Sequence, residues 1–260
     1  MAVLACPGSA FVMKMQEDQS PAKHRKHPAF LFECILSLLV IALLIIFVLP
    51  RVPHTGHVAS PRTYSGNNLK QIGIAMEDFV NSYGAFPLAA YCDKEGRPLY
   101  SWRVLLLPFL EEQSLYQQFN PDEPWDGPNN KLLLERMPTV YRHPLGNPKD
   151  LYATHYQVFT GGGAIFDHNQ QPILRFADII DGCSPTFTVV EAGTAVPWTK
   201  PEDLHYSPDK PLPRLGGIFP DGFNALTADG RVHWVRKNPD EKIIRAMITY
   251  KGGEEDSLRD

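Results

Sequence analysis

The chain has 260 residues, of which 43% are hydrophobic, and a formal net charge of −4. This length accommodates one sizeable domain plus an anchor, and the slightly acidic balance argues against nucleic acid as a partner. The 24 prolines and 19 glycines are spread along the chain, which is typical of a loop-rich globular domain rather than a disordered one.

The first element is an apolar segment that follows a polar leader, residues 1–30. Residues 31–49 read LFECILSLLVIALLIIFVL, with Glu33 as the one charged residue. As a helix this segment rises about 28 Å, which matches the hydrocarbon thickness of a bilayer, and Pro50 ends it. We therefore predict a transmembrane helix over 31–49. Two alternatives stay open: a buried core helix, which seldom lacks a polar face, and a cleaved signal peptide with an unusually long apolar core.

The basic residues around this segment set its orientation. The run KHRKH at 23–27 precedes it, whereas only Arg51 follows closely. The positive-inside rule then places the N-terminus in the cytoplasm and residues from about 51 onward outside. We expect a single-pass protein of the cytoplasmic membrane with an extracytoplasmic C-terminal domain.

A linker at 50–64, a globular domain at 65–252 and a polar tail at 253–260 complete the expected organisation. The domain should open with a helix that has Ser65 as N-cap and ends at Gly84. Its apolar residues fall at spacings of three and four: Leu69, Ile72, Ala75, Met76 and Phe79.

The remaining elements are shorter. Pro108 interrupts 101–119, which predicts a strand or turn followed by a helix over 109–119, and residues 131–136 form one or two helical turns. Alternation predicts strands at 154–160 and 186–191. Residues 224–228 and 231–235 form a hairpin, because Asp229-Gly230 suits a type I′ turn. An amphipathic helix over 240–250 completes an α+β domain.

Several ordered motifs carry a family resemblance. They are NNLKQIG at 67–73, YGAFP at 83–87, SWRVLLLP at 101–108, DEPWD at 122–126, DGCS at 181–184, and GFN at 222–224 with ADG at 228–230. Together they resemble a pilin-like family with domain of unknown function 1559, of the planctomycete type, which has a prepilin-like start and an H-X9-DG type C-terminal motif. The resemblance implies a pilin- or pseudopilin-like fold: an N-terminal transmembrane helix, then a helix packed on a mainly antiparallel sheet.

The resemblance also assigns one residue and marks three departures. Glu33 occupies the position of the glutamate that assists subunit assembly in pilins. The glycine required before the cleavage point is replaced by Pro28 or Ala29, so we expect the leader to be retained. His143 stands where relatives often have Cys, and Phe219 where many have His, so no role of those side chains is carried over.

Groups that could carry chemistry each have a plainer interpretation. His54 and His57 could bind zinc, but they lie in the linker without a third ligand nearby. Asp178 and Asp181 could serve as acid and base, or bind calcium with Glu191 or Asp229; the sequence ADIIDGCS fits the end of an element and a turn better. The glycines at 161–163 lack the Lys-Ser/Thr of a phosphate loop.

The cysteines and tryptophans give two further expectations. Cys183 could act as a nucleophile with His155 or His233 as base, although only the fold could assemble them. Cys92 and Cys183 are the two cysteines expected outside, where disulfides persist, and we predict that they pair. The tryptophans at 102, 125, 198 and 234 lie beside turns, and we expect them to pack in the core or against loops. If they were exposed, they would indicate a contact surface for a protein or a polysaccharide.

These patterns predict a non-catalytic, membrane-anchored envelope protein that displays a pilin-like interaction domain. The alternative is a pseudopilin subunit of a type II secretion or type IV pilus-like system, and a third is an envelope metal-dependent enzyme. The expected partners are the lipid bilayer and other pilin-like subunits or envelope proteins. We predict no catalytic residue, no metal, no cofactor and no nucleic-acid partner.

Overall fold

The computed structural model describes residues 32, 33, 35–41, 43, 59–167, 174–183 and 185–251. They belong to two compact units, residues 1–57 and 58–260. In the part of the first unit that is described, residues 32, 33, 35–41 and 43 are helical and exposed. None of the described helices is both long and apolar enough to cross a bilayer. The leader, residues 31, 34, 42 and 44–49 of the expected membrane segment, linker residues 50–58 and the tail lie outside the described residues.

The second unit opens with the long helix α2, Pro61–Tyr83. Ser60 caps its start by accepting the Thr63 N–H at 3.2 Å, and Pro61 occupies the first turn, where its missing N–H costs nothing. Gly84 ends the helix in the left-handed region, with φ of 80°. The predicted end is confirmed, whereas the predicted N-cap, Ser65, is wrong. Residues 61–64 carry no apolar period and therefore resembled linker.

Four strands form the main sheet: β3 (Ala153–Gln157), β5 (Phe187–Pro197), β7 (Gly222–Thr227) and β8 (Val232–Arg236). Their order is β3-β5-β7-β8 and all neighbours are antiparallel, so the expected α+β class with a mainly antiparallel sheet is confirmed. Two small pairs that the sequence did not predict are β1 (Ala90–Cys92) with β2 (Pro98–Ser101), antiparallel, and β4 (Phe159–Thr160) with β6 (Leu204–His205), parallel.

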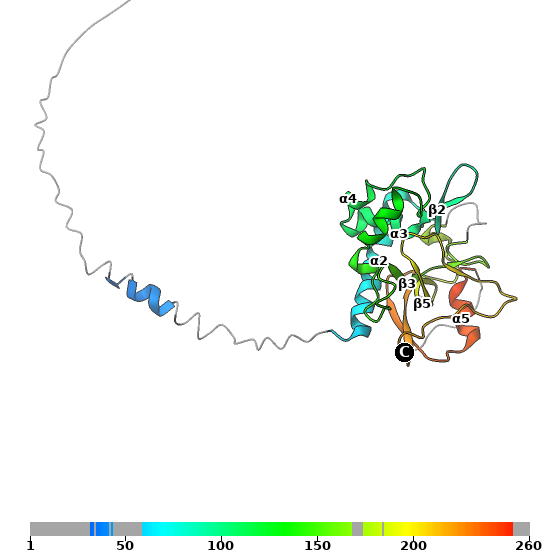
Figure 1. Cartoon of the computed structure of the whole chain (residues 1–260). Coiled ribbons are helices and arrows are strands. Elements are labelled where there is room, and N and C mark those ends of the chain that lie inside the picture. The colour runs from blue at the N-terminus through cyan, green and yellow to red at the C-terminus, as the bar shows by residue number, and fades with distance from the viewer. Residues whose placement is uncertain are drawn as a thin grey trace, which may run out of the picture. The chain divides into compact units, whose positions relative to one another are not determined.

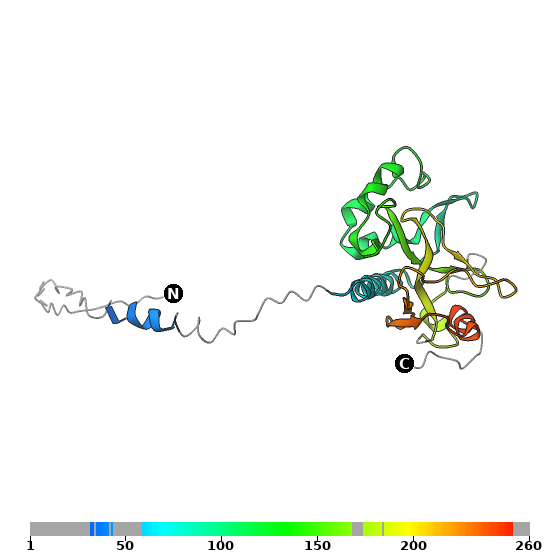
Figure 2. The same ribbon diagram turned by 60° about the horizontal axis from the view of Figure 1, so that its bottom comes forward.

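The sheet lies between two helices, α2 and α5 (Glu241–Ile248), as Figures 1 and 2 show. Leu69 and Ile72 of α2 share one core cluster with Val189 of β5. Ile244 of α5 shares a second cluster with Val190, the next residue of the same strand. Because successive side chains of a strand point to opposite faces, β5 supplies both layers of the core.

Short helical turns replace the helix expected over 109–119. The chain forms α3 (Trp102–Leu105), η1 (Leu107–Leu110) and α4 (Gln113–Tyr116). Pro108 sits in the first turn of η1, and Glu111 adopts a left-handed φ of 62° directly after it, which stops the helix. Further 3₁₀ turns are η2 (Asn130–Arg136), η3 (Thr139–Tyr141) and η4 (Phe176–Asp178).

The predicted hairpin is present as β7 and β8, but its turn is not type I′. A type I′ turn needs a positive φ at both central residues, and Asp229 does not have one, whereas Gly230 has φ of 77°. The Gly230 N–H donates to Thr227 O at 3.0 Å, and the Thr227 N–H donates to Arg231 O at 2.9 Å. This pattern is a type I turn followed by a glycine bulge.

Candidate functional site

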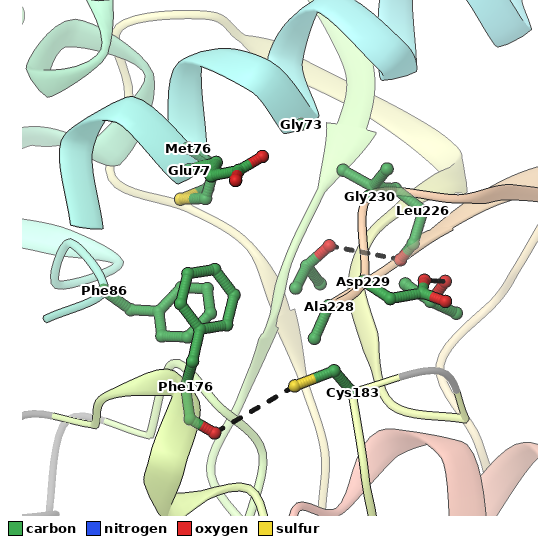
Figure 3. A pocket seen from close by; sticks show the side chains of 12 residues that line it. Gly73, Met76, Glu77, Phe86, Phe176, Cys183, Leu226, Ala228, Asp229 and Gly230 are labelled. Atoms are coloured by element: carbon green, nitrogen blue, oxygen red, sulfur yellow. Dashed lines mark hydrogen bonds between the residues drawn. The ribbon is translucent and has the colours of Figure 1, made fainter. Parts of the chain in front are cut away.

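A pocket of about 220 Å³ opens between α2, the segments around Phe86 and Phe176, and the turn after β7. Figure 3 shows α2 above it, with Met76 and Glu77, and the hairpin residues Ala228 and Asp229 opposite. Gly73 allows the close approach of helix and sheet here, since a Cβ at that position would lie 3.1 Å from the Leu226 side chain. The interior is apolar, and the carboxylates belong to the rim.

Cys183 lines this pocket with its sulfur turned toward Phe176 (Figure 3). The sulfur lies 4.0 Å from Phe176 O. Burial, with a smaller contribution from the negative charge of Asp229, raises the pKa of the thiol. A protonated thiol is a poor nucleophile, so the pocket does not activate Cys183.

The structure does not bring the suggested bases to Cys183. His155 lies on β3, where Nδ1 is 2.9 Å from Ala192 O, and burial lowers the pKa of the ring. His233 lies on β8. Neither histidine lines the pocket, so no nucleophile–base pair is assembled there.

The suggested calcium ligands are also dispersed. The Asp178 carboxylate accepts hydrogen bonds from Arg175 Nε at 3.2 Å and from the Arg175 backbone N–H at 2.9 Å. These bonds hold the pKa of Asp178 below its usual range. Glu191 is buried in β5, and Asp229 lies in the turn after β7. No group of three His, Cys, Asp or Glu side chains in the described part of the chain could hold a metal ion. His54 and His57 lie outside the described residues.

A buried polar cluster centred on Glu191 was not predicted from the sequence. Ser65 of α2 donates to Glu191 and shares a 2.8 Å hydrogen bond with Tyr156. Asn224 of β7 donates to the same carboxylate through its backbone N–H at 2.7 Å and its side-chain amide at 3.0 Å. His143 Nε2 lies 3.4 Å from Glu191 Oε1.

The cluster is built to hold a negative charge. Burial alone would raise the pKa of Glu191, but the donors His143, Ser65 and Asn224 outweigh burial and hold the pKa below its usual value. Because the carboxylate is fully buried, it has no access to substrate. It ties α2 to β5 and β7, which is a structural task.

A second buried charge pair joins Arg103, on the short helix α3 that follows β2, to Asp203, directly before β6. Arg103 Nη2 donates to Asp203 Oδ1 at 2.6 Å, with both side chains at most 2% exposed. Trp102 Nε1 and the Val158 N–H donate to the same oxygen. Burial raises the pKa of Asp203 to about 6, although Arg103 opposes it. A charged residue inside the apolar run SWRVLLLP was the sequence signal for such a pair.

The remaining predicted residues have these places. Cys92 and Cys183 are free thiols in this structure, so the expected disulfide is not formed; Cys92 Sγ lies 3.8 Å from Ala90 O. Trp102 and Trp198 are fully buried core residues, as expected. Trp125 packs against the first core cluster, and Trp234 is half-buried on β8. Glu33 is exposed on the helical residues of the first unit.

Residues 59–152 match the model of a family described as "Protein of unknown function (DUF1559)". Over these residues the chain is similar to that family. The DUF1559 match covers α2 and the short helical elements as far as η3, and it ends just before β3. The later motifs of the resemblance, from Asp181 to Gly230, lie beyond it. No curated protein and no solved structure matches the chain.

Proposed function

We propose that this chain is a non-catalytic, membrane-anchored envelope protein, and that residues 58–251 form a pilin-like interaction domain outside the cytoplasmic membrane. The observation that carries the proposal is the apolar surface of the first unit. Eight large side chains of the described helical residues are 48% exposed or more: Phe32, Ile35, Leu36, Leu38, Leu39, Val40, Ile41 and Leu43. None of them belongs to either core cluster.

So much contiguous apolar surface is unfavourable in water, because each buried Leu or Ile side chain is worth about 1.5–3 kcal/mol. A lipid bilayer would cover all sides of such a helix at once. The charge asymmetry around the segment, with KHRKH at 23–27 before it, favours a cytoplasmic N-terminus. The second unit would then be displayed outside.

A non-catalytic role is favoured by what the buried groups do. Glu191 and the Arg103–Asp203 pair link secondary-structure elements and are out of reach of a substrate. Cys183 is the candidate nucleophile that lines a pocket. Burial raises the pKa of its thiol, which keeps the thiol protonated. An envelope metal-dependent enzyme therefore has little to support it among the described residues.

A pseudopilin subunit is the alternative. Glu33 near the start of the apolar segment and a long helix packed on an antiparallel sheet favour it. Cleavage before such a segment needs a glycine, which this chain lacks at positions 28 and 29. We therefore infer that the leader is retained and the anchor is permanent.

Membrane fractionation with alkaline extraction tests the anchor. We expect the chain to stay in the membrane pellet and to need detergent for release. A variant with Leu38→Arg and Ile41→Arg should move to the soluble fraction, because a charged residue at the centre of the bilayer costs about 2.5–3.5 kcal/mol. Leu132→Arg, at an exposed leucine of the second unit, is the matched control and should leave fractionation unchanged. Wild-type protein in the soluble fraction would overturn the proposal.

Two further measurements test the topology and the alternative. Protease added to intact spheroplasts should degrade the second unit and spare residues 1–30. Mass spectrometry of the purified chain should find the N-terminal leader intact. A mature N-terminus at residues 29–31 would favour the pseudopilin instead.

A further inference from the structure

β8 is an edge strand of the main sheet, since β7 is its only neighbour in the order β3-β5-β7-β8. The Lys237 N–H donates to Asp221 O, so these two residues form a hydrogen-bonded pair. From there, hydrogen-bonded and non-hydrogen-bonded pairs alternate along the hairpin. In an antiparallel pair, every second residue directs its N–H and C=O away from the partner strand. These outward groups belong to Val232, Trp234 and Arg236, and no hydrogen bond joins them to another described residue.

A groove of about 1070 Å³ follows this edge. Every residue from Gly230 to Asp240 lines it. Since residues on both faces of the strand contribute, the groove lies along the edge and not on a face of the sheet. Arg62 and Lys70 of α2 form one wall, and Ile243 of α5 contributes to the other. A single extended strand fits between such walls.

The groove is strongly positive. Five exposed cations line it against one carboxylate, that of Asp240, in a chain whose net charge is −4: Arg62, Lys70, Arg231, Arg236 and Lys237. Arg231 pairs with Asp229 at 3.5 Å; the other four make no ion pair with described residues. The Arg62 guanidinium lies 3.9 Å above the Trp234 ring, which holds it at the mouth of the groove.

We propose that this groove binds an extended acidic segment of a partner protein, which adds to the sheet as a strand beside β8. The backbone groups of Val232, Trp234 and Arg236 pair with the segment, as in other complexes formed by strand addition. Its acidic side chains face Arg62 and Lys70, and the alternate apolar ones face Ile243. This gives the proposed interaction domain a partner class and does not depend on how the chain is anchored.

The charge of the groove also decides between occupants. A second copy of β8 would bring the same cations together, which is unfavourable. Positively charged edges protect many proteins from strand pairing, and that protection fails against a strand of opposite charge. The acidic segment is therefore the occupant that the groove favours.

Binding of a short fluorescent peptide of alternating Glu and Val to the full-length protein in nonionic detergent tests the proposal by fluorescence anisotropy. We expect saturable binding that weakens with salt. The double variant Arg236→Glu, Lys237→Glu should bind about tenfold more weakly or worse. Lys94→Glu, Lys149→Glu makes the same charge change at exposed sites outside the groove and should bind like the wild type.

A second peptide separates strand addition from simple charge attraction. Methylating alternate backbone nitrogens, at the residues whose N–H faces β8, removes donors and keeps every charge. We expect this peptide to lose binding, and a Lys–Val peptide not to bind. Equal binding of methylated and unmodified peptides would overturn the proposal. The proposal would also be overturned if the peptide did not bind, while Arg236 and Lys237 were needed for binding to phosphatidylglycerol vesicles or for self-association. If the fractionation test failed, the membrane anchor would be disproved, but peptide binding to the groove would still support the proposed strand addition.

Discussion

His143 Nε2 faces Glu191 Oε1 at 3.4 Å, and the two side chains are 0% and 1% exposed. The Leu145 N–H donates to His143 Nδ1 at 3.2 Å, so Nε2 is the ring nitrogen that faces the carboxylate. Phe219 packs against the same ring, with centroids 5.2 Å apart. Two of the three positions where the chain departs from the family pattern, 143 and 219, are therefore in contact beside Glu191.

Removing the carboxylate should destabilise the second unit. Glu191→Ala leaves the donors of Ser65 and Asn224 buried without an acceptor, and we expect a loss of about 3 kcal/mol in the free energy of unfolding. Urea unfolding in detergent at pH 7 measures it. Glu202→Ala, at an exposed glutamate, is the control and should cost less than about 1 kcal/mol. Equal effects of the two substitutions would contradict the role assigned to Glu191.

The same cluster should contribute to acid sensitivity. The folded-state pKa of Glu191 lies below its usual value of 4.5, so its contribution is present above that pH and is lost as pH falls through the folded pKa. Glu191→Gln keeps the shape and abolishes this titration. We expect the stability of the variant to fall less than that of the wild type between pH 5 and pH 3. Parallel pH profiles would show that Glu191 does not titrate in this way.

This cluster also shows what the sequence could and could not reveal. The spacing of Leu69 and Ile72 predicted α2, and Gly84 predicted its end. Ser65 was assigned to a cap because Ser is common there, yet its partner Glu191 lies 126 residues away, and no local pattern encodes that contact. Alternation predicted one strand over 154–160, which the structure divides into β3 and β4, whereas the two-residue strand β6 is too short for any period to show. Helix ends and long amphipathic elements follow from local physics, whereas buried polar partners follow from the tertiary fold.

The buried pair of Arg103 and Asp203 should respond to pH in the opposite direction. The pKa of Asp203 is raised to about 6, above its usual 3.8, so the folded state binds this proton more readily and gains stability as pH falls through that window. Arg103→Met leaves the carboxylate buried alone and should cost about 3–5 kcal/mol at pH 7.5. Part of this loss should return at pH 5, where Asp203 is protonated.

Two controls make the Arg103 prediction specific. Arg97→Met removes a cation that is 75% exposed and pairs with Asp93, and it should change stability by less than about 1 kcal/mol at either pH. In an Asp203→Asn background, Arg103→Met should lose its pH dependence between 5 and 7.5. Recovery at pH 5 that persists in that background would assign the effect to another group.

The cysteine state can be read by mass. Both thiols are free, and burial raises the pKa of each, so iodoacetamide at pH 7.5 should modify Cys92 and Cys183 slowly in the folded protein. After unfolding without a reductant, both should be alkylated rapidly. If protein prepared under oxidising conditions instead resisted alkylation at both cysteines until a reductant was added, the disulfide would be established.

Two glycines of α2 give a matched test of how closely the helix lies on the sheet. A Cβ at Gly66 would meet nothing nearer than 3.9 Å, whereas a Cβ at Gly73 would lie 3.1 Å and 3.3 Å from the two methyl groups of Leu226. Alanine gains about 1 kcal/mol over glycine within a helix, and crowding a packed core costs about 1–3 kcal/mol. Gly66→Ala should therefore raise the midpoint of urea unfolding and Gly73→Ala should lower it. If both variants were stabilised, the contact between α2 and β7 would be looser than the structure has it, and the pocket beside Cys183 would have room to adjust.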